Sequence, residues 1–202
     1  MIYLTRISTD TVQIARCHLG DNYSWHRELW KAFPGREEEK RDFLFRLDRR
    51  ERFLTVWILS ATQPTPLAWG CWDTKVVTDS FLKHKRYQFL LRANPTVMRV
   101  VRLEDGTRRK NGRRTTIYNA EELRQWLDEK AGLSGFTVDQ VAFDPPVKEY
   151  FLKGKTKGVH ARVDFSGILS VIDFEKFASA WQNGIGPARA FGFGLLLLSP
   201  VE

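Results

Sequence analysis

A glycine-rich stretch near the end of the chain constrains the fold more than any other segment. It runs from Gly184 to Gly194, contains four glycines, and continues into the leucines 195–198. Glycine adopts left-handed backbone conformations and allows close backbone approach at no steric cost, so the chain must turn sharply here or admit another group. The leucines predict a short strand buried on both faces. We interpret the stretch either as a loop that holds a phosphate, with Arg189 as its cation, or as a structural turn.

The charge of the chain points to a polyanionic partner. The 202 residues carry a formal net charge of +8 and are 43% hydrophobic, as expected for a globular protein whose first candidate partner is nucleic acid and whose second is an anionic membrane surface. Two cysteines and four scattered histidines form neither a disulfide framework nor a zinc pattern. The N-terminus does not resemble a signal peptide and no apolar run reaches membrane-spanning length, so we expect a cytoplasmic protein without a membrane partner.

Strand and helix signals divide the chain into two similar halves. Asn94-Pro95 interrupts the pattern, and we place the boundary there, with domains at 1–93 and 94–202. Each half has the order strand, helix, two or more strands, a helix or irregular piece, and a final strand. This order predicts an α+β fold of two tandem ferredoxin-like domains with antiparallel sheets. The second helix of the first half is not evident, and residues 69–80 have no clear assignment.

A cluster of basic residues follows the predicted boundary. We expect it to form a protruding hairpin that lies along a phosphate backbone, although a solvated loop is the alternative. Arginine predominates over lysine, as bidentate phosphate contacts favour. The seven basic residues are Arg99, Arg102, Arg108, Arg109, Lys110, Arg113 and Arg114.

A second basic segment spans 153–158 and contains Gly-Lys-Thr. It lacks the earlier glycine of the nucleotide-binding loop, so we predict a cationic turn over a nucleic acid, formed by Lys153, Lys155 and Lys157. The terminal glycine stretch also fails the dinucleotide pattern, because Arg189 occupies the place of the third glycine. We therefore expect no small-molecule cofactor, and we expect Gly184, Gly186 and Arg189 to contact an RNA backbone.

The segment 23–31 holds the candidate chemistry. On a helix, Trp25, Leu29, Ala32 and Phe33 share one anchoring face, whereas Tyr23, His26, Arg27, Trp30 and Lys31 gather on another. A histidine beside tyrosine and cations is suited to phosphodiester cleavage, since imidazole transfers a proton near neutral pH and the cations stabilise charge on the phosphate. A structural histidine is the alternative. His18, His84 and His160 have no evident partner.

RNA cleavage of this kind needs no metal, because the ribose 2′-hydroxyl is itself the nucleophile. The sequence has no Asp-x-Asp or carboxylate–histidine cluster of the type found in two-metal nucleases. We therefore predict chemistry without a metal cofactor.

Three segments resemble the CRISPR RNA-processing endoribonucleases of type I-E systems, the CasE family of the RAMP superfamily. The first is Tyr23-x-x-His26-x-x-Leu29-Trp30, with Phe33-Pro34 and Asp42-Phe43-Leu44-Phe45 after it. The second is Leu91-Arg92-Ala93-Asn94-Pro95, and the third is Gly184-Ile185-Gly186-Pro187-Ala188 with Gly194-Leu195-Leu196. They occur in the family's order over nearly the whole chain.

The resemblance implies metal-independent cleavage of the repeat hairpin in precursor CRISPR RNA, which leaves a 5′-hydroxyl and a 2′,3′-cyclic phosphate. It implies that His26 is catalytic, that Tyr23 assists and that Lys31 stabilises the phosphate, although Lys31 is variable in the family. It also implies RNA contacts by the arginine-rich hairpin and retention in a type I-E surveillance complex with other subunits. We expect the glycine stretch to bring the two domains together. The alternatives are a non-catalytic stem-loop RNA-binding subunit and, more remotely, a DNA-binding regulator.

Overall fold

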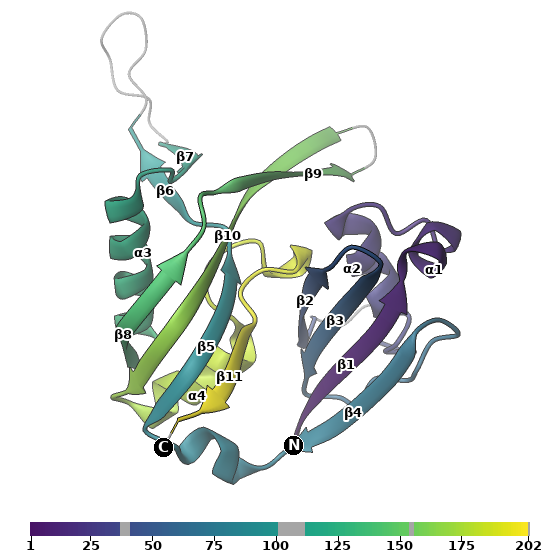
Figure 1. Ribbon diagram of the computed structural model, residues 1–202, viewed down its shortest axis with the longest axis horizontal. Coiled ribbons are helices and arrows are strands. Elements are labelled where there is room, and N and C mark those ends of the chain that lie inside the picture. The colour runs from purple at the N-terminus through teal and green to yellow at the C-terminus, as the bar shows by residue number, and fades with distance from the viewer. Residues whose placement is uncertain (37–40, 101–111, 154–155, 202) are drawn as a thin grey trace, which may run out of the picture.

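The computed structural model describes residues 1–36, 41–100, 112–153 and 156–201 and places most of its strands in two antiparallel sheets (Figure 1). The first sheet has the order β2 (Phe43–Arg49), β3 (Phe53–Ser60), β1 (Ile2–Asp10) and β4 (Cys71–Val77). The second has the order β11 (Leu196–Pro200), β5 (Arg86–Ala93), β10 (Thr156–Val171) and β8 (Phe136–Phe143), and β9 (Val147–Lys153) pairs with the first part of β10.

The helices and short elements complete the described part of the chain. The helices are α1 (Thr11–Arg16), α2 (Asn22–Trp30), α3 (Ala120–Leu133) and α4 (Phe174–Asn183). Two 3₁₀ turns, η1 (Asp79–Lys83) and η2 (Arg189–Phe191), precede β5 and β11 respectively. A separate two-stranded hairpin consists of β6 (Thr96–Arg99) and β7 (Arg113–Thr116).

Both sheets have the strand order of a ferredoxin-like fold. Within each half, the first and third strands are central, the fourth strand lies beside the first, and the second lies beside the third. This confirms the predicted fold class. The second helix is missing from the first half, because residues 61–70 form turns and irregular structure between β3 and β4. Residues 69–80, which had no assignment, supply the edge strand β4 and the beginning of the first 3₁₀ turn.

The sheets change before the boundary that the sequence predicts. Strand β5 lies within 1–93, yet it pairs with β10 and β11 of the second sheet and with no strand of the first. The predicted boundary at Asn94-Pro95 therefore does not coincide with the change of sheet, which occurs between Val77 and Arg86. Alternation along β5 revealed a strand, but alternation is a local property and does not identify the pairing partner.

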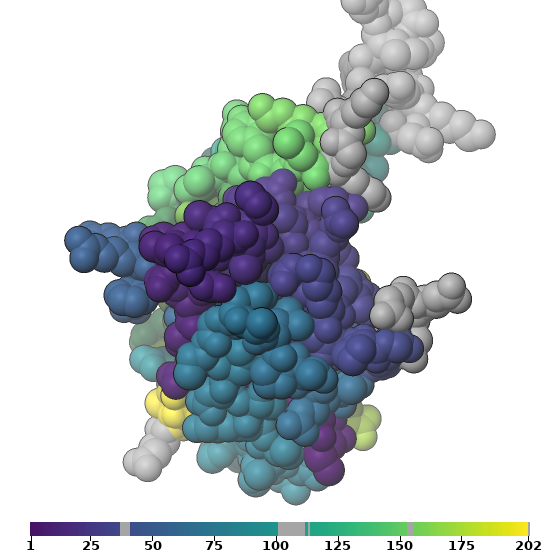
Figure 2. All heavy atoms as spheres, turned by 90° about the vertical axis from the view of Figure 1, so that its right-hand side faces the viewer, coloured from purple at the N-terminus to yellow at the C-terminus, as the bar shows by residue number. Residues whose placement is uncertain are grey.

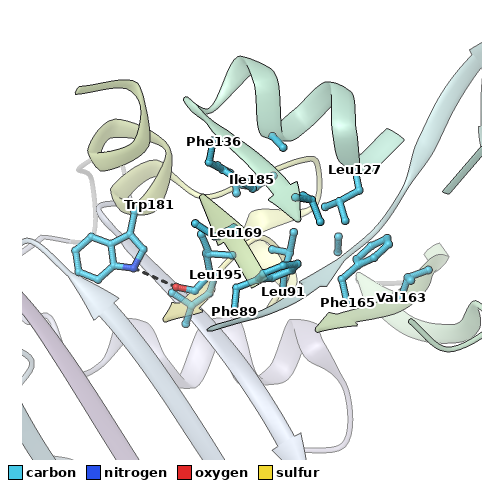
Figure 3. Close-up of a cluster of buried hydrophobic side chains, with 14 of the residues drawn as sticks. Phe89, Leu91, Leu127, Phe136, Val163, Phe165, Leu169, Trp181, Ile185 and Leu195 are labelled. Carbon is cyan, nitrogen blue, oxygen red and sulfur yellow. Dashed lines mark hydrogen bonds between the residues drawn. The ribbon is translucent and has the colours of Figure 1, made fainter. Parts of the chain in front are cut away.

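Two hydrophobic clusters fix the helices on the outer faces of the sheets. The second-sheet cluster includes Phe89, Leu91, Phe165 and Leu127, and Trp181 of α4 donates a hydrogen bond to the Leu196 carbonyl at 3.1 Å (Figure 3). The first-sheet cluster gathers α2 against β1, β2 and β3. These clusters hold α3 and α4 on one sheet and α2 on the other.

The inner faces of the sheets enclose an apolar cleft of about 780 Å³, lined by residues such as Leu4, Trp57 and Leu90. Strand β11 forms one edge of the second sheet, so Leu196 is buried whereas Leu197 and Leu198 are half-buried at this cleft. The prediction of a strand buried on both faces is therefore wrong for its second half. Among the described residues, no helix combines the length and apolarity needed to cross a membrane.

Candidate active site

Helix α2 carries His26 on a firmly anchored segment. Asp21 caps the helix: its side chain accepts a hydrogen bond from the Ser24 amide at 2.8 Å, and the Ser24 hydroxyl oxygen accepts one from the Asp21 amide at 3.2 Å. The predicted anchoring face is confirmed, since all four of its residues are buried: Trp25, Leu29, Ala32 and Phe33. Both the start and the rotation of the helix are thereby fixed.

Strand β9 also holds the start of α2, from the far half of the chain. The Leu152 amide donates a hydrogen bond to Asp21 at 2.9 Å, and the Asn22 side chain donates one to Glu149 at 2.7 Å. In Figure 2 the green β9–β10 hairpin lies directly against the purple N-terminal helices. Sequence reasoning missed Glu149, because a contact across 127 residues leaves no local pattern.

The imidazole of His26 is enclosed by aromatic rings. Its centroid lies 6.4 Å from that of Phe43 and 6.5 Å from that of Phe191. The indole nitrogen of Trp30 donates a hydrogen bond to His26 Nε2 at 3.3 Å, so the neutral ring carries its hydrogen on Nδ1. Nδ1 is buried and has no hydrogen-bond partner among the described residues.

These surroundings favour the neutral imidazole. Burial, and then the positive charge of Arg41, lower the pKa of His26 from 6.5 to about 4. Without RNA, His26 is therefore uncharged at neutral pH. A bound anion changes this balance, because a negative charge beside the ring favours the imidazolium and raises the pKa.

An NMR titration tests this electrostatic arrangement. The ring protons of His26, assigned with a His26→Gln variant, are expected to titrate with a midpoint near pH 4 in the free protein. Arg41→Gln removes the repelling charge and should raise that midpoint, although burial should keep it below 6.5. A midpoint at 6.5 in the unmodified protein would contradict the burial that the structure shows.

The glycine stretch lies beside α2 and forms part of the site. The Phe191 ring, in η2, contacts His26 and also lies 6.3 Å from the Tyr23 ring. Tyr23 and His26 thus share one neighbour that comes from the other half of the chain. The expectation that the glycine stretch joins the two halves is confirmed by these contacts.

The glycines of this stretch are required by close packing. All four adopt left-handed backbone angles: φ is 80° at Gly184, 82° at Gly186, 83° at Gly192 and 87° at Gly194. A Cβ atom at Gly194 would lie 2.7 Å from the Ile185 carbonyl oxygen, and one at Gly186 would lie 3.0 Å from the Trp126 ring. The structure thus supports the interpretation as a structural turn, and RNA contacts by Gly184 and Gly186 remain a proposal.

Sequence reasoning missed Arg41, whose positive charge helps to lower the pKa of His26. It precedes β2, and its Nη1 donates a hydrogen bond to the Arg189 carbonyl oxygen at 2.6 Å. Burial and the charge of Arg189 lower the pKa of Arg41 to about 10, which leaves it protonated at neutral pH. In the sequence, Arg41 lies in the charged run 36–42, which has the composition of a solvated loop, and this hides its role.

The two cations predicted on α2 lie at the surface. Arg27 is exposed, and Lys31 Nζ forms an ion pair with Glu28 at 2.6 Å. Glu28 also accepts a hydrogen bond from the Trp69 indole at 3.0 Å. Lys31 must therefore exchange this carboxylate for a phosphate if it is to act on RNA.

The structure describes part of the predicted basic hairpin. Arg99 and Arg113 pair across β6 and β7, and Arg99 forms an ion pair with Glu122 of α3 at 2.8 Å. Arg114 is exposed. Four of the predicted contacts lie outside the described residues: Arg102, Arg108, Arg109 and Lys110. Figure 1 places β6 and β7 beyond one end of α3.

The second basic segment lies at the tip of the β9–β10 hairpin. Lys157 is exposed, and its ammonium lies 4.5 Å from the centroid of the Tyr150 ring. Lys153 is the last residue of β9, and Lys155 lies outside the described residues. His160, which had no evident partner in the sequence, packs against Phe151 with ring centroids 4.6 Å apart.

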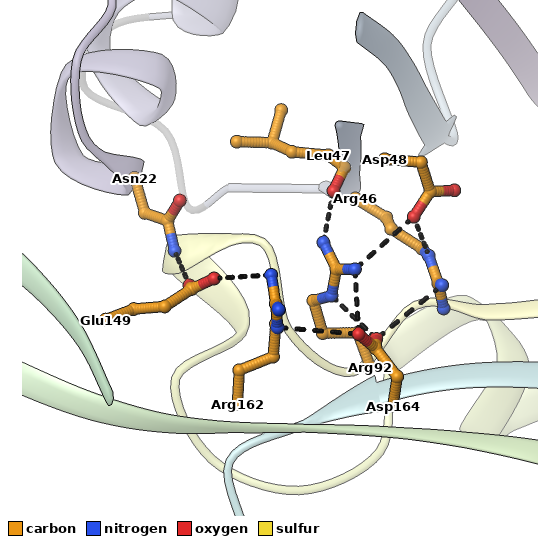
Figure 4. Close-up of polar contacts among 8 residues, drawn as sticks. All are labelled: Asn22, Arg46, Leu47, Asp48, Arg92, Glu149, Arg162 and Asp164. Carbon is orange, nitrogen blue, oxygen red and sulfur yellow. Dashed lines mark hydrogen bonds and ion pairs between the residues drawn. The ribbon is translucent and has the colours of Figure 1, made fainter. Parts of the chain in front are cut away.

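An ion-pair cluster connects the two sheets near the start of α2 (Figure 4). Asp164 of β10 accepts two hydrogen bonds from Arg92 of β5, at 2.7 and 3.0 Å. Arg46 of β2 lies 3.6 Å from Asp164 and bonds to Asp48 at 2.8 Å. Charged groups of both sheets thereby compensate one another at the interface.

Comparison with known proteins identifies relatives along the whole chain. A family model described as "CRISPR associated protein" matches residues 2–200. The Cascade subunit CasE of Escherichia coli K12 is 32% identical, over 94% of this chain and 98% of the relative. The CRISPR-associated endoribonuclease Cse3 of Thermus thermophilus is 28% identical, over 98% of this chain and all of the relative.

One solved structure has a similar fold over nearly the whole chain. It shows Thermus thermophilus Cse3 bound to an RNA that represents a pre-cleavage complex. The match has a TM-score of 0.78 with 25% sequence identity and covers 98% of this chain and 99% of the other.

Proposed function

We propose that this chain, which belongs to the CasE/Cse3 family of CRISPR-associated proteins, is an endoribonuclease that cleaves the repeat hairpin of precursor CRISPR RNA. The observation that carries the proposal is the position of His26. It lies on an anchored helix, beside Tyr23 and the glycine stretch, with a cation nearby. A relative with this fold is an endoribonuclease and has been solved with RNA, which supports the same class of activity and substrate.

The proposed step is attack by the ribose 2′-oxygen on the adjacent phosphorus. A bond forms between the 2′-oxygen and phosphorus, and the bond from phosphorus to the 5′-oxygen breaks. The proton of the 2′-hydroxyl passes to a base, and the 5′-oxygen receives a proton. The products are a 2′,3′-cyclic phosphate and a 5′-hydroxyl. The nucleophile belongs to the substrate, so the step requires no metal.

His26 is the proposed acid that protonates the leaving 5′-oxygen. Its imidazole is neutral in the free protein. The bound phosphate raises the pKa of His26, so that the imidazole becomes protonated in the complex and can donate this proton to the 5′-oxygen. Tyr23 is proposed to assist by hydrogen bonding. Lys31 is proposed to stabilise the phosphate once its pair with Glu28 opens, which leaves the largely buried Glu28 carboxylate with its hydrogen bond from Trp69.

Arg27 of α2, the basic residues outside this helix and two glycines are proposed to hold the RNA. Binding that depends on phosphate contacts weakens steeply as salt concentration rises. The proposed contacts comprise Arg27, Arg99, Arg102, Arg108, Arg109, Lys110, Arg113, Arg114, Lys153, Lys155, Lys157, Gly184, Gly186 and Arg189. We further propose that the protein stays on the mature RNA in the cytoplasm as a subunit of a type I-E complex, because the CasE relative is a Cascade subunit.

A single 2′-deoxy substitution tests the proposed chemistry. A repeat RNA that lacks the 2′-hydroxyl before the scissile phosphate should bind normally but resist cleavage, because its nucleophile is gone. The same RNA with a 2′-deoxy sugar one nucleotide away is the control and should be cut. Cleavage of the unmodified RNA should persist in EDTA and leave a cyclic phosphate, measured by mass spectrometry. Binding without cleavage of any RNA would instead favour a non-catalytic stem-loop-binding subunit.

A further inference from the structure

We propose that Arg41, together with Arg189, holds the reacting phosphate beside His26. This inference rests on the proposed function and adds a catalytic residue that the sequence did not indicate. It assigns to Arg41 the direct contact with the non-bridging phosphate oxygens and to Arg189 a second, more exposed contact.

Arg41 is linked to His26 through two neighbours of the imidazole, Phe43 and the η2 turn. The guanidinium carbon of Arg41 lies 5.7 Å from the centroid of Phe43, whose ring also contacts His26. Arg41 also donates a hydrogen bond to the carbonyl oxygen of Arg189. Arg189 lies two residues before Phe191, whose ring contacts His26. Phe43 and the η2 turn therefore each link Arg41 to the imidazole.

Among the described residues, the two arginines form a cationic pair that no carboxylate compensates. In the described part of the chain, no acidic side chain forms an ion pair with Arg41 or Arg189, and the Arg189 guanidinium donates to the Asn183 carbonyl at 2.7 Å. One of the five N–H groups of Arg41 is used by the Arg189 carbonyl. A half-buried guanidinium with remaining donors and no counter-charge in the described structure favours an anion, and its planar geometry matches phosphate.

An open cleft gives an anion access to this pair. Arg41 and Arg189 border a cavity of about 360 Å³, which Phe43 also lines but His26 does not. Asp42 also lines it, but its carboxylate accepts hydrogen bonds from Arg36 at 2.7 Å and from Thr62 at 3.1 Å. The acidic group next to the pair is thus already neutralised.

Lys31 differs from Arg41 in both its exposure and its ion pairing. Its ammonium is compensated by Glu28 and its side chain is 67% exposed, whereas Arg41 is half-buried and uncompensated among the described residues. Donors that need no rearrangement stabilise developing charge on phosphate oxygens best, because their orientation is set before the reaction. Arg41 meets this condition and Lys31 does not.

The test compares Arg41→Gln with Lys31→Gln, and with Arg6→Gln as a matched surface control. Arg6 is exposed and pairs with Asp73 at the far sheet edge. In single-turnover cleavage, Arg41→Gln should be about 10²- to 10³-fold slower, the usual loss for one donor to a developing oxyanion, and Lys31→Gln should lose less. Arg6→Gln should match the unmodified protein. Affinity for the 2′-deoxy RNA should change by less than about tenfold in the Arg41 variant, and Arg41→Lys should recover part of the rate.

A rate within about threefold of the unmodified protein, or a loss of RNA affinity as large as the loss of rate, would overturn the assignment. A second measurement does not depend on RNA cleavage. Inorganic phosphate added to the free protein should raise the pKa of His26, followed by NMR, and should have no such effect in Arg41→Gln. If the unmodified protein cuts no repeat RNA, the proposed function fails while this phosphate titration still decides whether the anion site exists.

Discussion

Replacement of His26 by alanine is expected to slow cleavage of repeat RNA by a factor of about 10² to 10⁴, the usual contribution of a positioned acid or base. The leaving 5′-oxygen would then take its proton from water, and no other described histidine is placed to substitute. His160 contacts Phe191, but its ring packs against Phe151 on the β9–β10 hairpin and not against Phe43 or Trp30. Binding of the 2′-deoxy RNA should change far less than the rate, because only the ionised fraction of His26 in the complex adds an attraction to phosphate that alanine lacks.

Matched variants separate chemistry from folding. His84→Ala removes an exposed histidine that lies beside Tyr87 in the connection between the two sheets, and it should cleave normally. His26→Gln keeps a polar side chain between Phe43 and Phe191 and should be as slow as His26→Ala, with thermal stability closer to that of the unmodified protein. Cleavage by both His26 variants at the unmodified rate would show that the acid lies elsewhere.

The sequence predicted the repeated ferredoxin-like order because each half carries its own signals. Alternating apolar residues in β1, β3 and β5 and the apolar face of α3 depend only on neighbouring positions. Which sheet receives β5 depends instead on β10, which lies far along the chain, so the boundary could not be read from the same signals.

The candidate site likewise combines residues that local sequence patterns predict with residues that such patterns do not reveal. The spacing of Tyr23 and His26 on α2, and the need for glycine at 184–194, are local properties and were predicted. Arg41 and Glu149 were missed because their roles arise from contacts across 148 and 127 residues. The charged run before β2 is indistinguishable in sequence from a solvated loop, and only the fold brings its last arginine to the glycine stretch.

The largest effect on stability is expected at Asp164, where the same long-range pairing joins the sheets. Its carboxylate lies close to three guanidinium groups: those of Arg92 at 2.7 Å, Arg46 at 3.6 Å and Arg162 at 3.4 Å. Burial alone would raise the pKa of Asp164, but the hydrogen bonds and charges of the arginines outweigh it and hold the pKa below its usual value. The ionised form is thus favoured in the folded protein.

Asp164→Ala should reduce the free energy of unfolding by about 3 kcal/mol, because it leaves the buried Arg92 and Arg46 side chains with Asp48 as the one described carboxylate that they still share. For a chain of this length, that corresponds to a fall in Tm of roughly 6 to 12 °C. Urea unfolding followed by circular dichroism measures the change, and Asp128→Ala, which breaks an exposed pair with Arg124, should cost less than about 1 kcal/mol.

The pH dependence gives this prediction a second, independent consequence. The folded pKa of Asp164 is depressed, so its stabilisation is present above the unfolded pKa and is lost as pH falls through the folded value. Asp164→Ala should therefore lose less stability in acid than the unmodified protein does, and the two should converge as pH falls below 3.8. Equal losses for Asp164→Ala and Asp128→Ala at neutral pH would show that the cluster contributes no more than a surface pair. A large loss would establish that charge compensation between β2, β5 and β10 holds together the two halves from which the His26 site is built.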